Sequence, residues 1–85
     1  MSATESDSPT LRLLGREDCP LCDEMWHSIW EAFPQARTRL QKVDVGSRAD
    51  WRKRFSLRIP VLLGADGRVI CEGHLDPEAL RKVLA

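Results

Sequence analysis

The sequence lacks most of the features that mark specialised classes of protein. It has no tyrosine, only three cysteines, and equal numbers of acidic and basic side chains, 13 of each. Three cysteines are too few, and odd in number, for the disulfide framework of a secreted protein. A formal net charge of zero gives no support for nucleic acid or an anionic membrane as the partner of the whole chain.

Targeting and membrane signals are also missing. The opening residues, MSATESDSPT, are small, polar and slightly acidic, without the basic start and apolar run of a secretory signal. We therefore expect residues 1–10 to be a disordered leader and residues 11–85 to form a single domain. No stretch approaches the roughly 20 apolar residues that cross a bilayer, so we expect a cytoplasmic monomer without a membrane partner.

Hydrophobic spacing and turn residues predict alternating strands and helices. A short apolar run closed by Gly15 predicts a buried strand. After it, apolar residues recur every three or four positions and predict a helix, with Pro20 in its first turn and Pro34 at its end. The predicted apolar stripe of this helix comprises Cys22, Trp26, Ile29 and Phe33, flanked by Met25 and Trp30.

Turn and capping residues divide the second half of the chain. Ser47, with Asp50 three positions later, predicts the start of a second helix. The Asp-Gly pair at 66–67 predicts a hairpin turn, and Asp76 followed by proline predicts the N-terminus of a last helix. The predicted strands are 11–14, 38–45, 61–63 and 68–72, and the predicted helices are 19–33, 47–55 and 77–85.

The order of these elements, β-α-β-α-β-β-α, predicts an α/β fold. The first strand, helix and strand require a parallel pair with a right-handed crossover. The Asp-Gly hairpin adds an antiparallel pair. We therefore expect a mixed four-stranded sheet flanked by helices.

Two cysteines occur three positions apart where the first strand leads into the first helix. Unpaired backbone N–H groups and the positive end of the helix dipole favour a thiolate at such a position, which is that of Cys19. Cys22 is one turn further along the same side, within reach of a disulfide. This arrangement suits Cys19 as the nucleophile that attacks a disulfide and Cys22 as the thiol that resolves the mixed disulfide.

The chain at this point resembles the glutaredoxins, within the thioredoxin fold. The resemblance rests on Cys-Pro-Leu-Cys after a strand, Ile59-Pro60 before a strand, and Gly73 with Asp76 before the last helix, and it covers residues 11–85. It implies a redox-active dithiol in a thiol–disulfide oxidoreductase that reduces protein or mixed disulfides, and a cis peptide bond at Pro60. The substrate-binding residues that it implies are Arg16, Pro20, Leu21, Ile59, Pro60, Gly73 and Asp76.

The sequence also departs from the glutaredoxin pattern. Leu21 replaces the usual aromatic residue, Arg58 stands where a threonine is usual, and His74 replaces a second glycine. The expected partner is accordingly either a disulfide-containing protein or glutathione as co-substrate, with no bound cofactor. A basic stretch before the proline loop, which comprises Arg48, Arg52, Lys53, Arg54 and Arg58, offers a surface for glutathione carboxylates or an acidic protein, or simply the solvated face of a helix.

Two other functions stay open from the sequence. Cys71 and His74 form a C-x-x-H pair that, with Cys19 and Cys22, offers a nominal Cys3His zinc set. The 48 residues between Cys22 and Cys71 exceed the usual spacing of zinc modules, so we predict no metal site. A binding or adaptor module that keeps the fold without turnover is the second alternative, because a fold does not establish an activity.

Overall fold

The computed structural model describes residues 10–85, so the predicted leader lies outside the described residues except for Thr10. Within that range the chain forms four strands, three α-helices and two short 3-10 turns. The strands are β1 (Leu11–Gly15), β2 (Leu40–Asp44), β3 (Val61–Leu63) and β4 (Val69–Glu72). The α-helices are α2 (Pro20–Ala32), α3 (Ala49–Phe55) and α4 (Pro77–Leu84), and the turns are Pro34–Ala36 and Val45–Ser47.

The sheet is mixed, as predicted. Its strand order is β2-β1-β3-β4. β1 pairs in parallel with β2, whereas β3 runs antiparallel to both β1 and β4. The α2 crossover joins the parallel pair and the Asp66-Gly67 turn joins the antiparallel one, which confirms the predicted α/β thioredoxin-like order.

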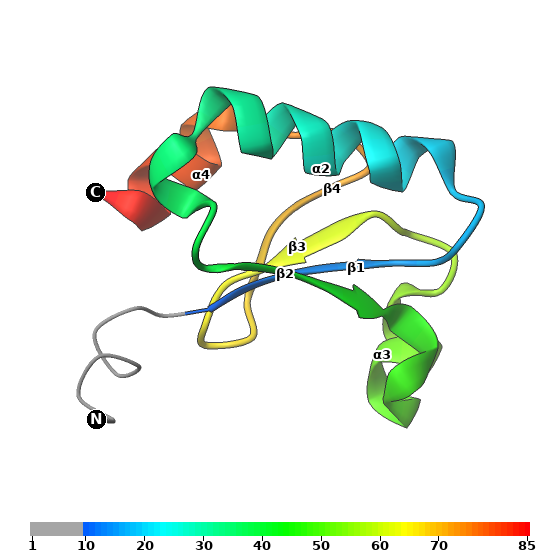
Figure 1. The fold of residues 1–85 in the computed structure, drawn as a ribbon. Coiled ribbons are helices and arrows are strands. Elements are labelled where there is room, and N and C mark those ends of the chain that lie inside the picture. Colours follow the sequence, from blue (N-terminus) through cyan, green and yellow to red (C-terminus); the bar gives the residue numbers. More distant parts are fainter. Residues whose placement is uncertain (1–9) are drawn as a thin grey trace.

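Helices cover both faces of the sheet. Figure 1 shows α2 and α4 on one face and α3 on the other. Leu13 packs into the core beneath α2 and α4, and the next residue, Leu14, packs into the core against α3. Because both faces of the sheet are covered, β3 is apolar at every position, and β1 is interrupted only by the partly buried Arg12.

The buried stripe of α2 differs by one residue from the predicted one. Cys22, Met25, Ile29 and Phe33 are buried, but Trp26 is only partly buried and Trp30 is 38% exposed. The two indole rings stack on each other with centroids 5.6 Å apart. Positions 25 and 26 both lie near the centre of the helical stripe, and the slender, flexible methionine occupies the tight space above the sheet. The bulkier indole lies at its border.

The predicted N-terminus of α3 is wrong, whereas that of α4 is confirmed. Arg48, not Ser47, is the N-cap residue of α3, and its side chain makes no capping hydrogen bond. Ser47 instead ends a 3-10 turn that is capped by Asp44, whose carboxylate accepts from the Gly46 N–H. Within residues 10–85, no helix has the length and apolar character needed to cross a bilayer.

Candidate active site

The cysteine pair lies where β1 leads into α2. Cys19 is the N-cap residue of α2, and its sulfur accepts a hydrogen bond from the Cys22 N–H at 3.2 Å. Pro20 takes the first helical position, where a missing N–H breaks no bond. The two cysteines form a disulfide with Cα atoms 5.2 Å apart. The helix N-terminus therefore directs a backbone donor and its positive dipole end at the Cys19 sulfur.

The two sulfurs differ in accessibility. Cys22 is 6% exposed and belongs to the buried face of α2, while Cys19 is partly exposed. A molecule arriving from solvent therefore meets Cys19 first. This asymmetry suits Cys19 for attack on a substrate and Cys22 for a reaction within the protein.

Gly15, which the sequence indicated only as the end of a strand, makes room for the Cys22 side chain. A Cβ atom at this position would lie 2.9 Å from the Cys22 sulfur and 3.1 Å from its Cβ. Only glycine allows so close an approach of the strand end to the helix. The sequence signal for this contact is a glycine that ends a strand four residues before a Cys-x-x-Cys motif.

Asp18, immediately before Cys19, also has an unusual backbone. Its φ is 58°, in the left-handed region that residues other than glycine, asparagine and aspartate rarely adopt. The short loop from Arg16 to Asp18 turns sharply here to bring Cys19 to the start of α2.

The proline loop lies at the same end of the sheet as the cysteines. Val61 pairs with Leu14, so Pro60 precedes β3 beside the point where Gly15 ends β1. The Ile59–Pro60 peptide bond is cis, as the family resemblance implied. The Gly73 N–H donates to the Pro60 carbonyl at 2.8 Å, and Gly73 has a φ of 79°.

The other predicted substrate-binding residues are dispersed around this end. Leu21 is 45% exposed and Pro20 is exposed, so both present side chains to solvent beside Cys19. Asp76 is the N-cap of α4, where its carboxylate accepts from the Ala79 N–H at 3.2 Å. The Asp76 carboxylate therefore has a structural role as the cap of α4.

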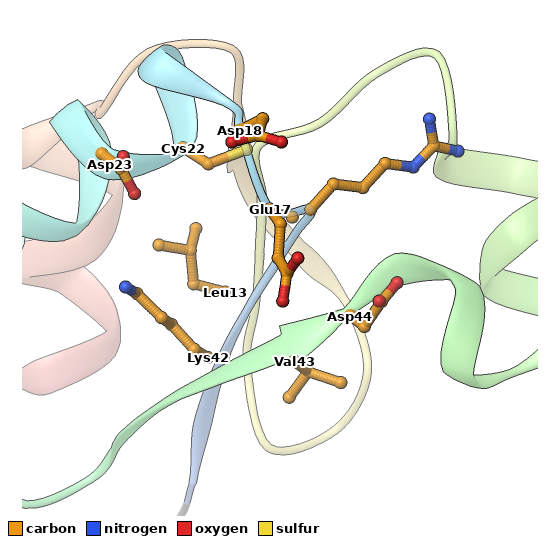
Figure 2. A pocket seen from close by; sticks show the side chains of 10 residues that line it. Leu13, Glu17, Asp18, Cys22, Asp23, Lys42, Val43 and Asp44 are labelled. Atoms are coloured by element: carbon orange, nitrogen blue, oxygen red, sulfur yellow. The ribbon is translucent and has the colours of Figure 1, made fainter.

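A cavity of about 520 Å³ opens beside Cys22 (Figure 2). Of the predicted site residues, Arg16 and Cys22 line it. Lys42 and Asp44 join it because Leu13 pairs with Lys42 and Gly15 with Asp44 in the parallel ladder. Sequence reasoning missed both residues. The complete lining is Leu13, Gly15, Arg16, Glu17, Asp18, Cys22, Asp23, Lys42, Val43 and Asp44.

Much of the predicted basic stretch is engaged within the fold and lines no part of this cavity. Arg48 forms an ion pair with Asp50 at 2.8 Å, and the guanidinium lowers the pKa of that carboxyl. Arg52 donates to the Gly46 carbonyl at 2.9 Å. Arg58, which stands where glutaredoxins usually have a threonine, donates two hydrogen bonds to the Glu72 carboxylate, at 2.6 and 3.2 Å.

The third cysteine is separate from the pair. Cys71 lies on β4, is 8% exposed and packs in the core beneath α2 and α4, where burial raises the pKa of its thiol. Its nominal zinc partner His74 is exposed. Within residues 10–85, no three His, Cys, Asp or Glu side chains are grouped to hold a metal ion. The nominal Cys3His set is therefore not assembled.

Comparisons with known proteins agree with this architecture. The solution NMR structure of protein Ne2328 from Nitrosomonas europaea is similar in fold, with a TM-score of 0.79. The two chains are 24% identical, and the match covers 92% of this chain and 93% of that one. A comparison with curated proteins found no match. The model of the glutaredoxin-like domain family (DUF836) matches residues 10–85, and with a Cys-x-x-Cys pair at the start of α2 the chain belongs to this family.

Proposed function

We propose that this protein is a thiol–disulfide oxidoreductase that reduces disulfides in proteins or mixed disulfides. The observation that supports this proposal best is the Cys19–Cys22 disulfide at the N-terminus of α2, with the outer sulfur partly exposed and the inner one buried. A thiolate at Cys19 gains from the Cys22 N–H and the helix dipole. The reacting sulfur is thereby reachable, and these two groups favour its thiolate, while the nearby carboxylates of Glu17, Asp18 and Asp23 oppose it.

The reaction passes through one mixed disulfide. In the reduced protein, the Cys19 thiolate attacks one sulfur of the substrate disulfide, and the other half of the substrate leaves as a thiolate that takes a proton from water. Cys22 then loses its proton to solvent and attacks the Cys19 sulfur. The bond between Cys19 and the substrate breaks, and the second substrate half leaves as a thiolate. Two electrons pass to the substrate, and the protein retains the Cys19–Cys22 disulfide.

Regeneration needs a thiol reductant, for which we propose glutathione or a reduced dithiol protein. In this proposal the substrate-facing rim comprises Arg16, Pro20, Leu21, Ile59 and Gly73, and the exposed Asp76 contributes at its border. Pro60, whose side chain is fully buried, contributes through its backbone. We propose that the chain acts as a monomer in the cytoplasm, where reducing thiols keep the pair cycling.

Three serine variants of the full chain test this function. Reduced protein is mixed with a peptide carrying a glutathione mixed disulfide, and release of the peptide thiol is followed over time. We expect Cys19→Ser to lose turnover. Cys22→Ser should accumulate a covalent adduct on Cys19, visible by mass spectrometry. Cys71→Ser, which removes the free thiol that takes no part in the pair, is the matched control and should retain turnover.

The outcomes separate an enzyme from an adaptor. Full turnover by Cys19→Ser contradicts the assigned nucleophile. If the unsubstituted protein also leaves glutathione and 2-mercaptoethanol mixed disulfides unreduced, the oxidoreductase proposal fails, and a binding module that keeps the fold becomes the better explanation.

A further inference from the structure

The cavity beside Cys22 has the dimensions of a small-ligand site and is large enough to admit a long side chain. Its volume, about 520 Å³, falls within the range of small-ligand sites. Leu13, on the α2 face of the sheet, supplies an apolar side chain to this cavity, and Cys22 borders it. A group bound here is therefore next to the disulfide and only one helical turn from Cys19.

Charge in this cavity is predominantly negative. Four carboxylates and two cations line it, which leaves an excess of two negative charges. Figure 2 shows Glu17 reaching from the loop towards β2, Asp18 at the Cys22 end, and Lys42 along the opposite side. A cation in this cavity lies near carboxylates from both the loop and α2, namely Glu17, Asp18 and Asp23.

The cavity carboxylates have few internal counter-ions. The Lys42 ammonium lies over the Trp26 ring, 5.0 Å from its centroid. Among residues 10–85, no ion pair joins Glu17, Asp18 or Asp23 to a basic side chain. Their charge is thus available to an incoming group.

We infer that this cavity binds a cationic group of the disulfide substrate, namely a lysine or arginine side chain close to the substrate cysteine. The inference rests on the proposed function and specifies its substrate class. Leu13 suits the methylene stem of such a side chain, while the carboxylates receive its charged end. The same carboxylates repel glutathione disulfide, which carries net negative charge, so basic protein disulfides are the favoured substrates.

A pair of peptides tests this preference. Each carries one cysteine as a mixed disulfide with 2-mercaptoethanol, and the two differ only in lysine or glutamate two positions before that cysteine. Rates with the reduced protein are divided by rates with dithiothreitol, which removes differences in intrinsic reactivity. At low salt we expect the lysine peptide to react about tenfold faster than the glutamate peptide. An exposed charge pair changes the rate about threefold, and the lysine gains this factor while the glutamate loses it. Added salt should diminish that preference.

Neutral variants identify the groups responsible. Glu17→Gln and Asp23→Asn should each reduce the preference about threefold, because each removes one cavity carboxylate. Glu31→Gln, an exposed carboxylate near the other end of α2, is the matched control and should retain the full preference. Equal rates for the two peptides, or a preference unchanged in both cavity variants, overturn the inference and leave the oxidoreductase proposal standing.

Binding without turnover distinguishes the two proposals. The oxidised protein is titrated with the lysine peptide in which serine replaces cysteine, and backbone amide shifts are followed by NMR. We expect shifts at Gly15, Glu17, Asp23 and Lys42, and their loss in the double variant Glu17→Gln/Asp23→Asn. Absence of these shifts overturns the cavity inference whatever the turnover result. Shifts without reduction of either peptide contradict only the oxidoreductase proposal.

Discussion

Replacing Gly15 with alanine would place a methyl group against the inner sulfur of the redox pair. The new Cβ would lie 2.9 Å from the Cys22 sulfur and 3.1 Å from the Cys22 Cβ. Both contacts are several tenths of an ångström shorter than ordinary carbon contacts of about 3.5 Å. The Cys22 Cβ is fixed by the α2 backbone, so relief must come from the sulfur or from a shift of the strand end.

The oxidation state decides how much relief is available. In the dithiol, the Cys22 sulfur is free to rotate to another rotamer, whereas in the disulfide its bond to Cys19 prevents that rotation. Overpacking of this kind costs about 1–3 kcal/mol. If most of the cost falls on the oxidised form, the reduction potential rises by about 20–60 mV, at about 30 mV for each 1.4 kcal/mol.

Equilibration with defined ratios of reduced and oxidised dithiothreitol, followed by alkylation and mass spectrometry, measures the potential of Gly15→Ala. Gly64→Ala is the matched control, because the nearest atoms to its Cβ would be the Asp66 carboxylate at 3.3 Å, Ile70 at 3.7 Å and the Arg68 carbonyl at 3.9 Å, none of which belongs to the pair. We expect little change in the control. A potential for Gly15→Ala that is unchanged or lowered would refute the reasoning.

Three further predictions concern the rest of the site. Asp76→Ala should lower the free energy of unfolding by about 0.5–2 kcal/mol in urea titrations, because it removes the bond to the Ala79 N–H, whereas Asp76→Asn should retain most of it. Turnover that falls in both variants without a loss of stability would make Asp76 a substrate-binding residue instead. A double-mutant cycle of Arg58→Ala and Glu72→Ala should give a coupling energy of at most about 1 kcal/mol, since the pair is exposed; a much larger value would contradict this screening argument. Burial raises the pKa of Cys71 above its ordinary value of 9.0, so its thiol should be alkylated far more slowly in native than in urea-unfolded protein at pH 8. The stability contributed by the neutral thiol is complete below pH 9.0 and declines as pH rises beyond it, so unfolding of Cys71→Ala should depend less on pH there.

Local signals were sufficient for most of the secondary structure. Pro20 at the first helical position, the Asp66-Gly67 turn and the Asp76-Pro77 start of α4 lie as predicted. Each depends on interactions within a few residues of the chain, which the sequence contains directly. Where two local signals competed, the prediction failed. Ser47 is not the N-cap of α3 because it belongs to the preceding 3-10 turn, which Asp44 caps, and α3 begins after Arg48.

The surroundings of the redox pair depend on contacts that are distant in sequence. Lys42 and Asp44 line the cavity only because β2 pairs in parallel with β1, and Gly73 meets Pro60 only because β3 pairs with β4. Arg58, read from the sequence as part of a basic surface, is engaged by Glu72 from the neighbouring strand. No spacing rule connects these residues.

The sequence alone determined the order of elements, the fold class and the position of Cys19 at a helix N-terminus, because hydrophobic period, turn residues and caps act over one or two turns of chain. The tertiary structure decided which charges surround Cys22, which partner Arg58 pairs with, and that Gly15 rather than a larger residue must face the inner sulfur. These outcomes follow from strand register and side-chain packing, which are fixed only when distant segments meet.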